Sequence, residues 1–432
     1  MKKIVIFLSI LGGFLMGSTV ENIDINGSKV PIIFEQNSYL PIISIQIVFE
    51  GSGELSSPVD GLANLSARLL NEGTKKDGSS KFAKKMDEKA ISISAQATRS
   101  NFIIELNTLK SEYSSAIKLL NELLKDPNYS EKALDRIKRQ QIGWLTQKES
   151  DYDYISRNLL SKVLFQGTPL ARDSKGTKDS TLKTTLKDIE GFLNSRLGYN
   201  NAIVVIGGDI SKEVAKQSVT NILKNLKKVE KFELENINAS NKREIKQENK
   251  KDIHQAYIYF GAPLYFSYDS EDQYKAKIAS HILGESGFGS RIMEEVRVKR
   301  GLAYSAYAVL VRSKLSSYMI GSLQTKVENK DKAIGVVKKV IDDFVKEGIT
   351  QKELDEAKEF LLGSEALRNE TLSQRLNRAF ENYYLGRPLG FEKEQLKKIE
   401  NASLEEINSF IKAHKEITKI SFSIVTKGNK NK

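Results

Sequence analysis

The chain has 432 residues and a formal net charge of +12, and it contains no cysteine and three histidines. The lack of cysteine excludes disulfides, iron–sulfur clusters and thiol catalysis, and the few histidines limit any metal site. The lysines are spread along the chain and interleaved with glutamates rather than gathered in basic blocks. We therefore expect no nucleic-acid partner. The length predicts two domains of ordinary size.

The N-terminal residues combine positive charge with a short apolar run. Two lysines precede apolar residues over 4–16, and the small residues Gly17 and Ser18 follow. That run is too short to span a bilayer comfortably, which favours a secretory signal peptide over 1–18. The alternative is an uncleaved anchor at the membrane interface. We expect a protein exported across the inner membrane to the periplasm, without a transmembrane span in its mature part.

The first half alternates between strand and helix patterns. Asn26-Gly27 is a hairpin turn signal. Apolar residues alternate in the stretch that follows, whereas the leucines of 62–70 recur at helical spacing. In chain order we expect strands at 20–25, 30–35, 41–50, 91–97, 101–109 and 202–206, and helices at 62–73, 81–90, 114–124, 130–147, 154–164 and 185–193.

Residues 226–252 lose this apolar periodicity, which is typical of a linker. After them the order repeats, because TLKDIEGFL and NNAIVVIGGD in the first half match SLEEINSFI and TKISFSIVTKG in the second. The repeat predicts two homologous domains, 19–225 and 253–432, of α+β class, each an antiparallel-rich mixed sheet covered by helices. In the second half we expect strands at 254–260, 304–311, 317–327 and 420–425, and helices at 274–283, 333–345, 350–362, 371–384 and 403–411.

A glycine-rich stretch over 284–307 reads GESGFGSRIMEEVRVKRGLAYSAY. Its pattern predicts a glycine loop, a two-turn helix, a tight turn and a strand. Glycine lets the backbone approach another chain closely, because no side chain stands between them. Arg297 near the helix end and Tyr304 on the strand can then point at one place, where both would donate to a polarised carbonyl oxygen. The alternative is a solvated Arg297 and a half-buried Tyr304.

The string GFGSRIMEEVRVKRGLAYSAYA resembles the second-domain signature of the insulinase/pitrilysin-type metallopeptidases. The resemblance covers essentially the whole chain after the signal segment, and it is to the short two-domain members that pair as subunits, such as the mitochondrial and bacterial processing peptidases. In that family an arginine and a tyrosine at this spacing hold the substrate backbone near the metal. The resemblance therefore implies a substrate-binding role for Arg297 and Tyr304.

The first domain departs from the family pattern at the metal site. The family has His-x-x-Glu-His in a string similar to GLAHxxEHxxxxGT, whereas this chain has GLANLSARLLNEGT over 61–74. The resemblance places Asn64 and Arg68 where two imidazole ligands belong, and Ala67 where the general-base glutamate belongs. A glutamine, Gln140 or its neighbour, stands where the third ligand belongs.

This replacement has a physical consequence for metal binding. In the intact motif, two ligands at i and i+4 share one helical face and the glutamate activates the bound water. Arginine cannot ligate a cation and keeps its proton at ordinary pH, so Arg68 would repel zinc. We expect no metal in this chain, and we expect the guanidinium of Arg68 to pair with a carboxylate.

These features indicate a noncatalytic subunit of an extracytoplasmic zinc peptidase, with no catalytic residue in this chain alone. In the family's two-chain members one chain carries zinc and its fellow supplies the arginine and tyrosine. The resemblance thus implies a zinc-bearing paralogous partner in a heterodimer, a peptide substrate, and zinc only in the partner. Pairing of the chain with itself stays open.

Two other classes of function remain. The first is a stand-alone peptide-binding or scaffold protein of the same fold, because a sheet edge can hold an extended peptide as an added strand. The second is an enzyme of unrelated mechanism, for which we find no G-x-S-x-G elbow and no Gly-Lys-Ser/Thr phosphate loop. His281 and Glu285, at i and i+4, would need a third ligand to hold a metal.

Overall fold

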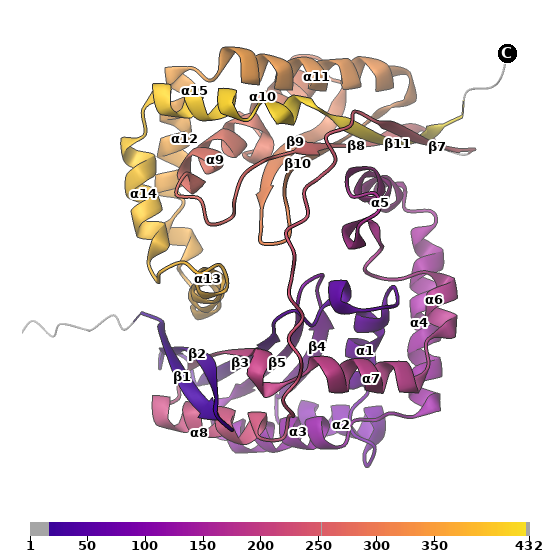
Figure 1. Cartoon of the computed structure of the whole chain (residues 1–432), viewed down its shortest axis with the longest axis vertical. Coiled ribbons are helices and arrows are strands. Elements are labelled where there is room, and N and C mark those ends of the chain that lie inside the picture. The colour runs from indigo at the N-terminus through magenta and orange to yellow at the C-terminus, as the bar shows by residue number, and fades with distance from the viewer. Residues whose placement is uncertain (1–16, 252, 429–432) are drawn as a thin grey trace, which may run out of the picture.

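The computed structural model describes residues 17–251 and 253–428, so the expected signal peptide over 1–18 lies almost wholly outside the described residues. Within the described ranges, no helix is both long and apolar enough to cross a membrane. Figure 1 shows two halves, each built on a sheet with helices packed against it.

The first half is built on a six-stranded sheet in the order β1-β2-β6-β3-β5-β4. Strands β2 and β6 are parallel and the other neighbours are antiparallel. The strands are β1 (Thr19–Ile25), β2 (Ser28–Gln36), β3 (Ile42–Phe49), β4 (Ser92–Ala97), β5 (Phe102–Leu109) and β6 (Ala202–Gly208). The helices are α1 (Leu62–Leu70), α2 (Gly78–Asp87), α3 (Tyr113–Lys125), α4 (Glu131–Lys148), α5 (Tyr152–Leu164), α6 (Lys178–Lys183), α7 (Leu186–Arg196) and α8 (Lys212–Leu223).

The second half repeats this design in a five-stranded sheet, in the order β7-β11-β8-β10-β9, with a parallel β7–β11 pair. Its strands are β7 (Ile245–Lys250), β8 (Gln255–Pro263), β9 (Ala303–Arg312), β10 (Ser317–Lys326) and β11 (Ser421–Lys427). Its helices are α9 (Gln273–Ser280), α10 (Arg291–Met293), α11 (Lys330–Glu347), α12 (Gln351–Gly363), α13 (Leu372–Tyr384), α14 (Phe391–Asn401) and α15 (Leu404–Ala413). This order is that of the first sheet without β1, so the predicted repeat and fold class are confirmed.

Local sequence signals set several element boundaries. Asn26 and Gly27 both have positive φ, 50° and 79°, which is the geometry of a type I′ hairpin turn between β1 and β2. Thr185 and Ser403 open the equivalent helices α7 and α15 with capping boxes. These signals are local, so the sequence alone was sufficient to place them.

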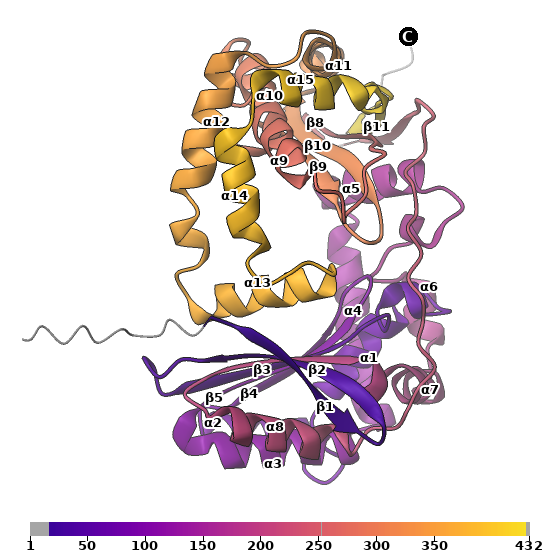
Figure 2. The ribbon, with the colours of Figure 1, turned by 60° about the vertical axis from the view of Figure 1, so that its left-hand side comes forward.

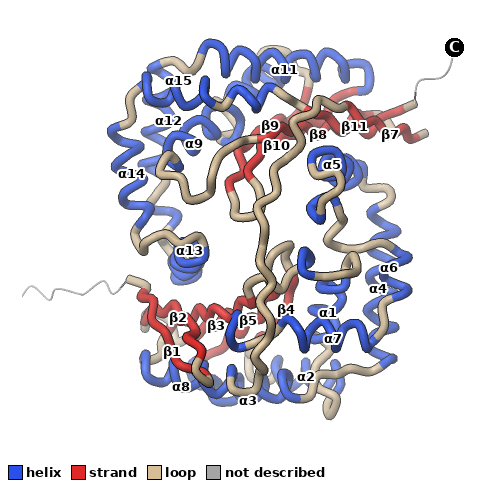
Figure 3. The backbone as a smooth tube through the Cα atoms, in the orientation of Figure 1, coloured by secondary structure: helices blue, strands red, loops and turns tan. Residues whose placement is uncertain are grey.

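The predicted linker over 226–252 is only partly correct. Figure 3 shows an extended segment that runs from α8 toward the second half, but its end forms the edge strand β7. This strand pairs in parallel with β11 and is mostly exposed. Its stability comes from main-chain hydrogen bonds to β11, and these require no alternation of apolar residues. A prediction based on apolar periodicity therefore does not detect this strand.

One helix of each half packs against the sheet of the other half, an arrangement here called the helix exchange. Helix α5 belongs to the first half in sequence but packs against β8 and β11 of the second sheet. Helix α13 belongs to the second half but packs against β2 and β6 of the first sheet, as Figures 1 and 2 show. The two contacts are built alike: Leu376 of α13 fits over Gly207, and Leu164 of α5 fits over Gly261. The sequence halves therefore are not separate packing units.

Ion pairs and hydrogen bonds reinforce this exchange. Arg375 of α13 contacts the buried Glu35 of β2, with Nε 2.7 Å from Oε1. Ser156 of α5 is fully buried and donates to the carbonyl oxygen of Tyr257 at 3.0 Å. The hydroxyl of Ser423 on β11 donates in turn to the carbonyl oxygen of Ser156 at 2.7 Å.

Candidate functional site

Helix α1 presents the zinc-motif positions on a largely buried face. Asn64 is 9% exposed and Ala67 is buried, and Asn64 and Arg68 lie one turn apart on one side of the helix. The Nη2 of Arg68 donates to Oε1 of Gln140 on α4 at 3.0 Å. The structure thus brings Arg68 and Gln140 together. The expected carboxylate partner for Arg68 is wrong, because α4 presents a neutral amide at this place.

A lysine from the loop before α6, Lys175, also contacts this side of α1. Together with Asn64, Arg68, Gln140 and Glu54 it forms a set of residues here called the α1 group. Lys175 Nζ donates to Oδ1 of Asn64 at 3.0 Å. The backbone of this lysine is held in place, because its carbonyl oxygen accepts from Nε2 of Gln141 at 2.9 Å. A Cβ on Gly61 would lie 2.8 Å from the Cα of Gly176, so the loop packs directly on the start of α1. Gln141 therefore supports the loop, and Gln140 is the glutamine that faces the motif.

Glu54 lies beneath the start of α1 and is 7% exposed. Its Oε1 accepts from the backbone N–H of Asn64 at 2.7 Å. Burial raises the pKa of Glu54 to about 7, although this hydrogen bond and the nearby Lys175 favour the ionised form. Burial also lowers the pKa of Arg68, which still remains a cation at neutral pH.

The residues at these positions do not fit zinc. Zinc needs imidazole, thiolate or carboxylate ligands, and Asn64, Ala67, Arg68 and Gln140 supply two amides, a methyl group and a cation. The ammonium of Lys175 adds a second positive charge. Over residues 17–251 and 253–428, no group of three or more His, Asp or Glu side chains is arranged to hold a metal.

Arg297 and Tyr304 lie in the other half of the molecule. Arg297 is in the π-helical turn Glu294–Val298, and its guanidinium lies over the ring of Phe288, 4.8 Å from the centroid. Tyr304 is 80% exposed near the start of the edge strand β9. In the part of the chain that the structure describes, no hydrogen bond joins the two side chains or connects either of them to the α1 group.

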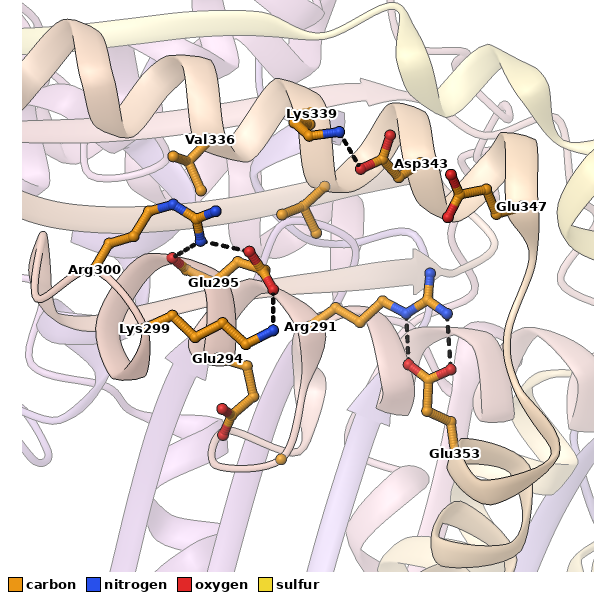
Figure 4. Close-up of a pocket in the computed structure, with 12 residues that line it drawn as sticks. Arg291, Glu294, Glu295, Lys299, Arg300, Val336, Lys339, Asp343, Glu347 and Glu353 are labelled. Atoms are coloured by element: carbon orange, nitrogen blue, oxygen red, sulfur yellow. Dashed lines mark hydrogen bonds and ion pairs between the residues drawn. The ribbon is translucent and has the colours of Figure 1, made fainter.

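Figure 4 shows how the segment before Arg297 is anchored beside a cavity of about 380 Å³. The guanidinium of Arg291 makes a two-pronged contact with Glu353, at 2.6 and 2.7 Å. Lys299 and Arg300 both contact Glu295. Because these charges pair with one another, we interpret the ion pairs that line this cavity as structural: they hold the turn that carries Arg297 in place.

The glycine loop before this turn contains a close backbone approach, to β9 of the same chain rather than to another chain. A Cβ on Gly284 would lie 2.3 Å from the backbone nitrogen of Ala308 on β9, so only glycine fits there. Gly287 and Gly289 have positive φ, 72° and 88°, and have open space around them. Gly284 therefore serves packing, whereas the other two serve the turn of the loop.

Sequence reasoning missed two members of the α1 group, Glu54 and Lys175. Glu54 precedes the motif by ten residues in a run of small residues, GSGELSS, where a single carboxylate is a weak signal. Lys175 reaches α1 across 111 residues of sequence, and no local pattern encodes such a contact.

Comparison with known proteins agrees with this geometry. Residues 32–178 match the family model described as "Insulinase (Peptidase family M16)", and 183–361 match "Peptidase M16 inactive domain". The chain is 42% identical over 435 residues to the Helicobacter pylori protein named "Non-peptidase homolog YmxG", with 100% of both chains covered. It is 22% identical to the Bacillus subtilis "Uncharacterized zinc protease YmxG", over 88% of this chain and 92% of that one.

Solved structures share the fold. The "peptidase M16 inactive domain" structure from Pseudomonas fluorescens matches with a TM-score of 0.86 at 22% identity, covering 96% of this chain and 99% of that chain. The periplasmic protease PqqL from Escherichia coli matches with a TM-score of 0.76 at 13% identity, covering 96% of this chain and 48% of that chain. The two family models and the 42% identical relative establish that the chain is a member of the insulinase (M16) peptidase family.

Proposed function

We propose that this chain is a noncatalytic subunit of an extracytoplasmic M16 zinc peptidase and works in trans with a zinc-bearing paralogue. One observation carries the proposal: the guanidinium of Arg68, bonded to Gln140, stands where a zinc ligand belongs. The name "Non-peptidase homolog" of the H. pylori relative supports this reading.

In this proposal Arg297 and Tyr304 bind the peptide that the partner cleaves. Tyr304 is exposed on the edge strand β9, where its hydroxyl is free to donate to an approaching backbone. Arg297 is supported from one side by Phe288, which leaves its N–H groups for a ligand. Together they would orient the peptide and stabilise the oxyanion that forms at the partner's zinc.

The export of the chain to the periplasm is part of the same proposal. It is supported by the lysines and the apolar run over 2–16 and by the periplasmic location given for the structural relative PqqL. Osmotic-shock fractionation with an antibody to the chain would test it, and recovery with cytoplasmic markers alone would contradict it.

Reconstitution tests the subunit assignment. The purified chain alone is expected to hold no stoichiometric zinc and to leave a quenched fluorescent peptide uncut, whereas mixing with a paralogue that has an intact His-x-x-Glu-His should give activity. Arg297→Ala should lower the rate of the complex about a hundredfold, because an oxyanion donor is lost. Arg300→Ala is the matched control, since Arg300 is engaged by Glu295.

Two results would overturn the assignment. The first is a full rate in the Arg297→Ala complex. The second is tight zinc binding by the isolated chain, read by metal analysis. A variant with Asn64→His, Arg68→His and Gln140→Glu serves as the positive control for that measurement, because it restores three ligands on α1 and α4, and helical spacing sets two of them on one face.

A second candidate function is a peptide-binding scaffold without a hydrolytic partner. It is favoured by the edge strands β4 and β9, which lie at one end of each sheet. Asn71 already bonds the main chain of Ala95 on β4 and Ser280 that of Leu310 on β9, so an extended peptide would be added as a strand along the remaining part of either edge. Peptide binding by the lone chain, together with the lack of a paralogue that copurifies with it, would select this function.

A further inference from the structure

The α1 group presents hydrogen-bond donors where the family presents metal ligands. Lys175 Nζ lies 3.0 Å from the side-chain amide of Asn64. An ammonium group can only donate, so the amide atom that faces it must be the oxygen, and Nδ2 of Asn64 must point away from Lys175. That Nδ2 is buried and has no hydrogen-bond partner among residues 17–251 and 253–428, and Asn64 itself is 9% exposed.

Arg68 repeats this arrangement one turn along α1. Its Nη2 is engaged by Gln140, whereas its Nε is buried and has no hydrogen-bond partner within the described ranges. Side chains at i and i+4 on a helix are neighbours, about 6 Å apart at Cβ, so the two residues with free donors share one face of α1. A buried donor without a partner is costly, and two of them on one helix face point to an acceptor from outside the chain.

The charges around these donors favour an anion. Arg68 and Lys175 are both cations in contact with the group, and neither makes an ion pair within the described residues. Glu54 is a carboxyl group near Lys175, and its Oε1 already accepts from the α1 backbone at 2.7 Å. Burial raises the pKa of Glu54 to about 7, so its negative charge is only partial at neutral pH. The net charge of Arg68, Lys175 and Glu54 together is therefore positive.

The site is held in place and borders solvent on one side. Gln141 fixes the backbone of Lys175, and α1 itself is a buried core helix. Gln140 is exposed, so the side of the group beside α4 is in contact with water, whereas the two donor atoms themselves are buried. A ligand would therefore reach these donors from the side of Gln140.

We propose that Asn64, Arg68 and Lys175, here called the donor cluster, bind a carboxylate at the positions where other family members hold zinc. The free Nδ2 of Asn64 and Nε of Arg68 donate to the carboxylate oxygens, and Lys175 adds charge. The carboxylate belongs to a peptide C-terminus or to a free organic acid. The peptide source rests on the proposed function, whereas the donor cluster itself does not.

The only tryptophan of the chain gives a direct readout. Trp144 lies on α4 one helical turn after Gln140, which bonds Arg68 of the donor cluster. The full chain is titrated at constant ionic strength with sodium succinate, with triglycine, and with triglycine amide, while Trp144 fluorescence is recorded. We expect a saturable change with succinate, with triglycine, or with both, and none with the amide.

Variants connect the signal to the donor cluster. Arg68→Gln removes one donor and one charge, and Asn64→Asp supplies an internal carboxylate, so each should weaken binding at least about tenfold. Lys183→Gln is the charge-matched control, because Lys183 lies in an exposed pair with Asp179. Far-UV circular dichroism checks that each variant is folded.

The outcomes separate the sources and the proposals. A response to triglycine assigns a peptide terminus, and a response to succinate alone assigns a free acid. No response to either acid, or equal binding by wild type and Arg68→Gln, overturns the carboxylate site. Carboxylate binding by a chain that fails to activate any paralogue would overturn the proposed function and leave the donor cluster standing.

Discussion

The ion pair between α13 and the first sheet allows a quantitative test of the helix exchange. Glu35 of β2 has a side chain that is 4% exposed, and Arg375 of α13 lies against it at 27% exposure. Replacing Arg375 by Met keeps the apolar stem but leaves the Glu35 carboxylate buried without its counter-charge. Removing one partner of a buried pair costs about 3–5 kcal/mol, and we expect about 3 because water reaches Arg375.

The assay is urea unfolding followed by Trp144 fluorescence and by far-UV circular dichroism. Lys183→Met is the matched control: its pair with Asp179 is 74% and 73% exposed, so its loss should cost about 0.5 kcal/mol or less. Adding Glu35→Gln to Arg375→Met removes the orphaned charge and should recover at least about 1 kcal/mol. The reasoning is refuted if Arg375→Met is no more costly than the control.

Three further variants test other parts of the structure. Burial raises the folded-state pKa of Glu54 from 4.5 to about 7, so between these pH values the folded state binds more protons than the unfolded state. The free energy of unfolding should therefore fall by about 3 kcal/mol as the pH rises through this range. Glu54→Gln should flatten that fall, as measured by urea unfolding at about pH 5 and about pH 8; an unchanged slope would rule out Glu54 as its source. Gly284→Ala should cost about 2 kcal/mol or more in unfolding free energy, because its Cβ would meet backbone at 2.3 Å, whereas Gly287→Ala should cost about 1; equal losses would contradict the close approach. Ser156→Ala should cost about 1–3 kcal/mol in chemical unfolding, because its buried hydroxyl bonds the main chain of β8 at 3.0 Å, and a neutral result would show that this hydroxyl does not hold α5 in place.

The elements that the sequence predicted are those with local causes. The turn at Asn26-Gly27 and the caps of α7 and α15 depend on residues a few positions apart. Helix α1 was predicted because its leucines share one face. Helices α6, α8 and α14 were missed. Of these, α8 has a readable stripe of buried residues at helical spacing, whereas α6 has only six residues and α14 has only two buried residues.

The candidate site could be predicted only where the motif was contiguous. The positions of Asn64 and Arg68 follow from one string, and Gln140 faces Arg68 as the resemblance implied. Lys175 enters from a distant loop, so nothing in its neighbourhood indicates the contact. The substrate-binding roles of Arg297 and Tyr304 stay predictions, because their side chains contact no ligand here.

The strand β7 could have been predicted from the internal repeat, although its apolar periodicity does not indicate a strand. Its place beside β11 corresponds to that of β2 beside β6, since both pairs are parallel and lie at equivalent positions in the two sheets. Extending the repeat backward from β8 would have predicted a strand within 226–252. The helix exchange was not predictable in this way, because an apolar stripe shows that a helix is covered but not by which sheet.

The helix exchange also constrains the order in which parts of the chain can fold during synthesis. The partners Glu35 and Arg375 are 340 residues apart. Helix α13 can therefore cover this face of β2, β3 and β6 only after nearly the whole chain has been synthesised. Until then the apolar side chains of Ile33, Val48 and Val205 are uncovered, and a chain truncated before α13 would expose them permanently. The nascent chain is therefore prone to aggregation until α13 (Leu372–Tyr384) has been made.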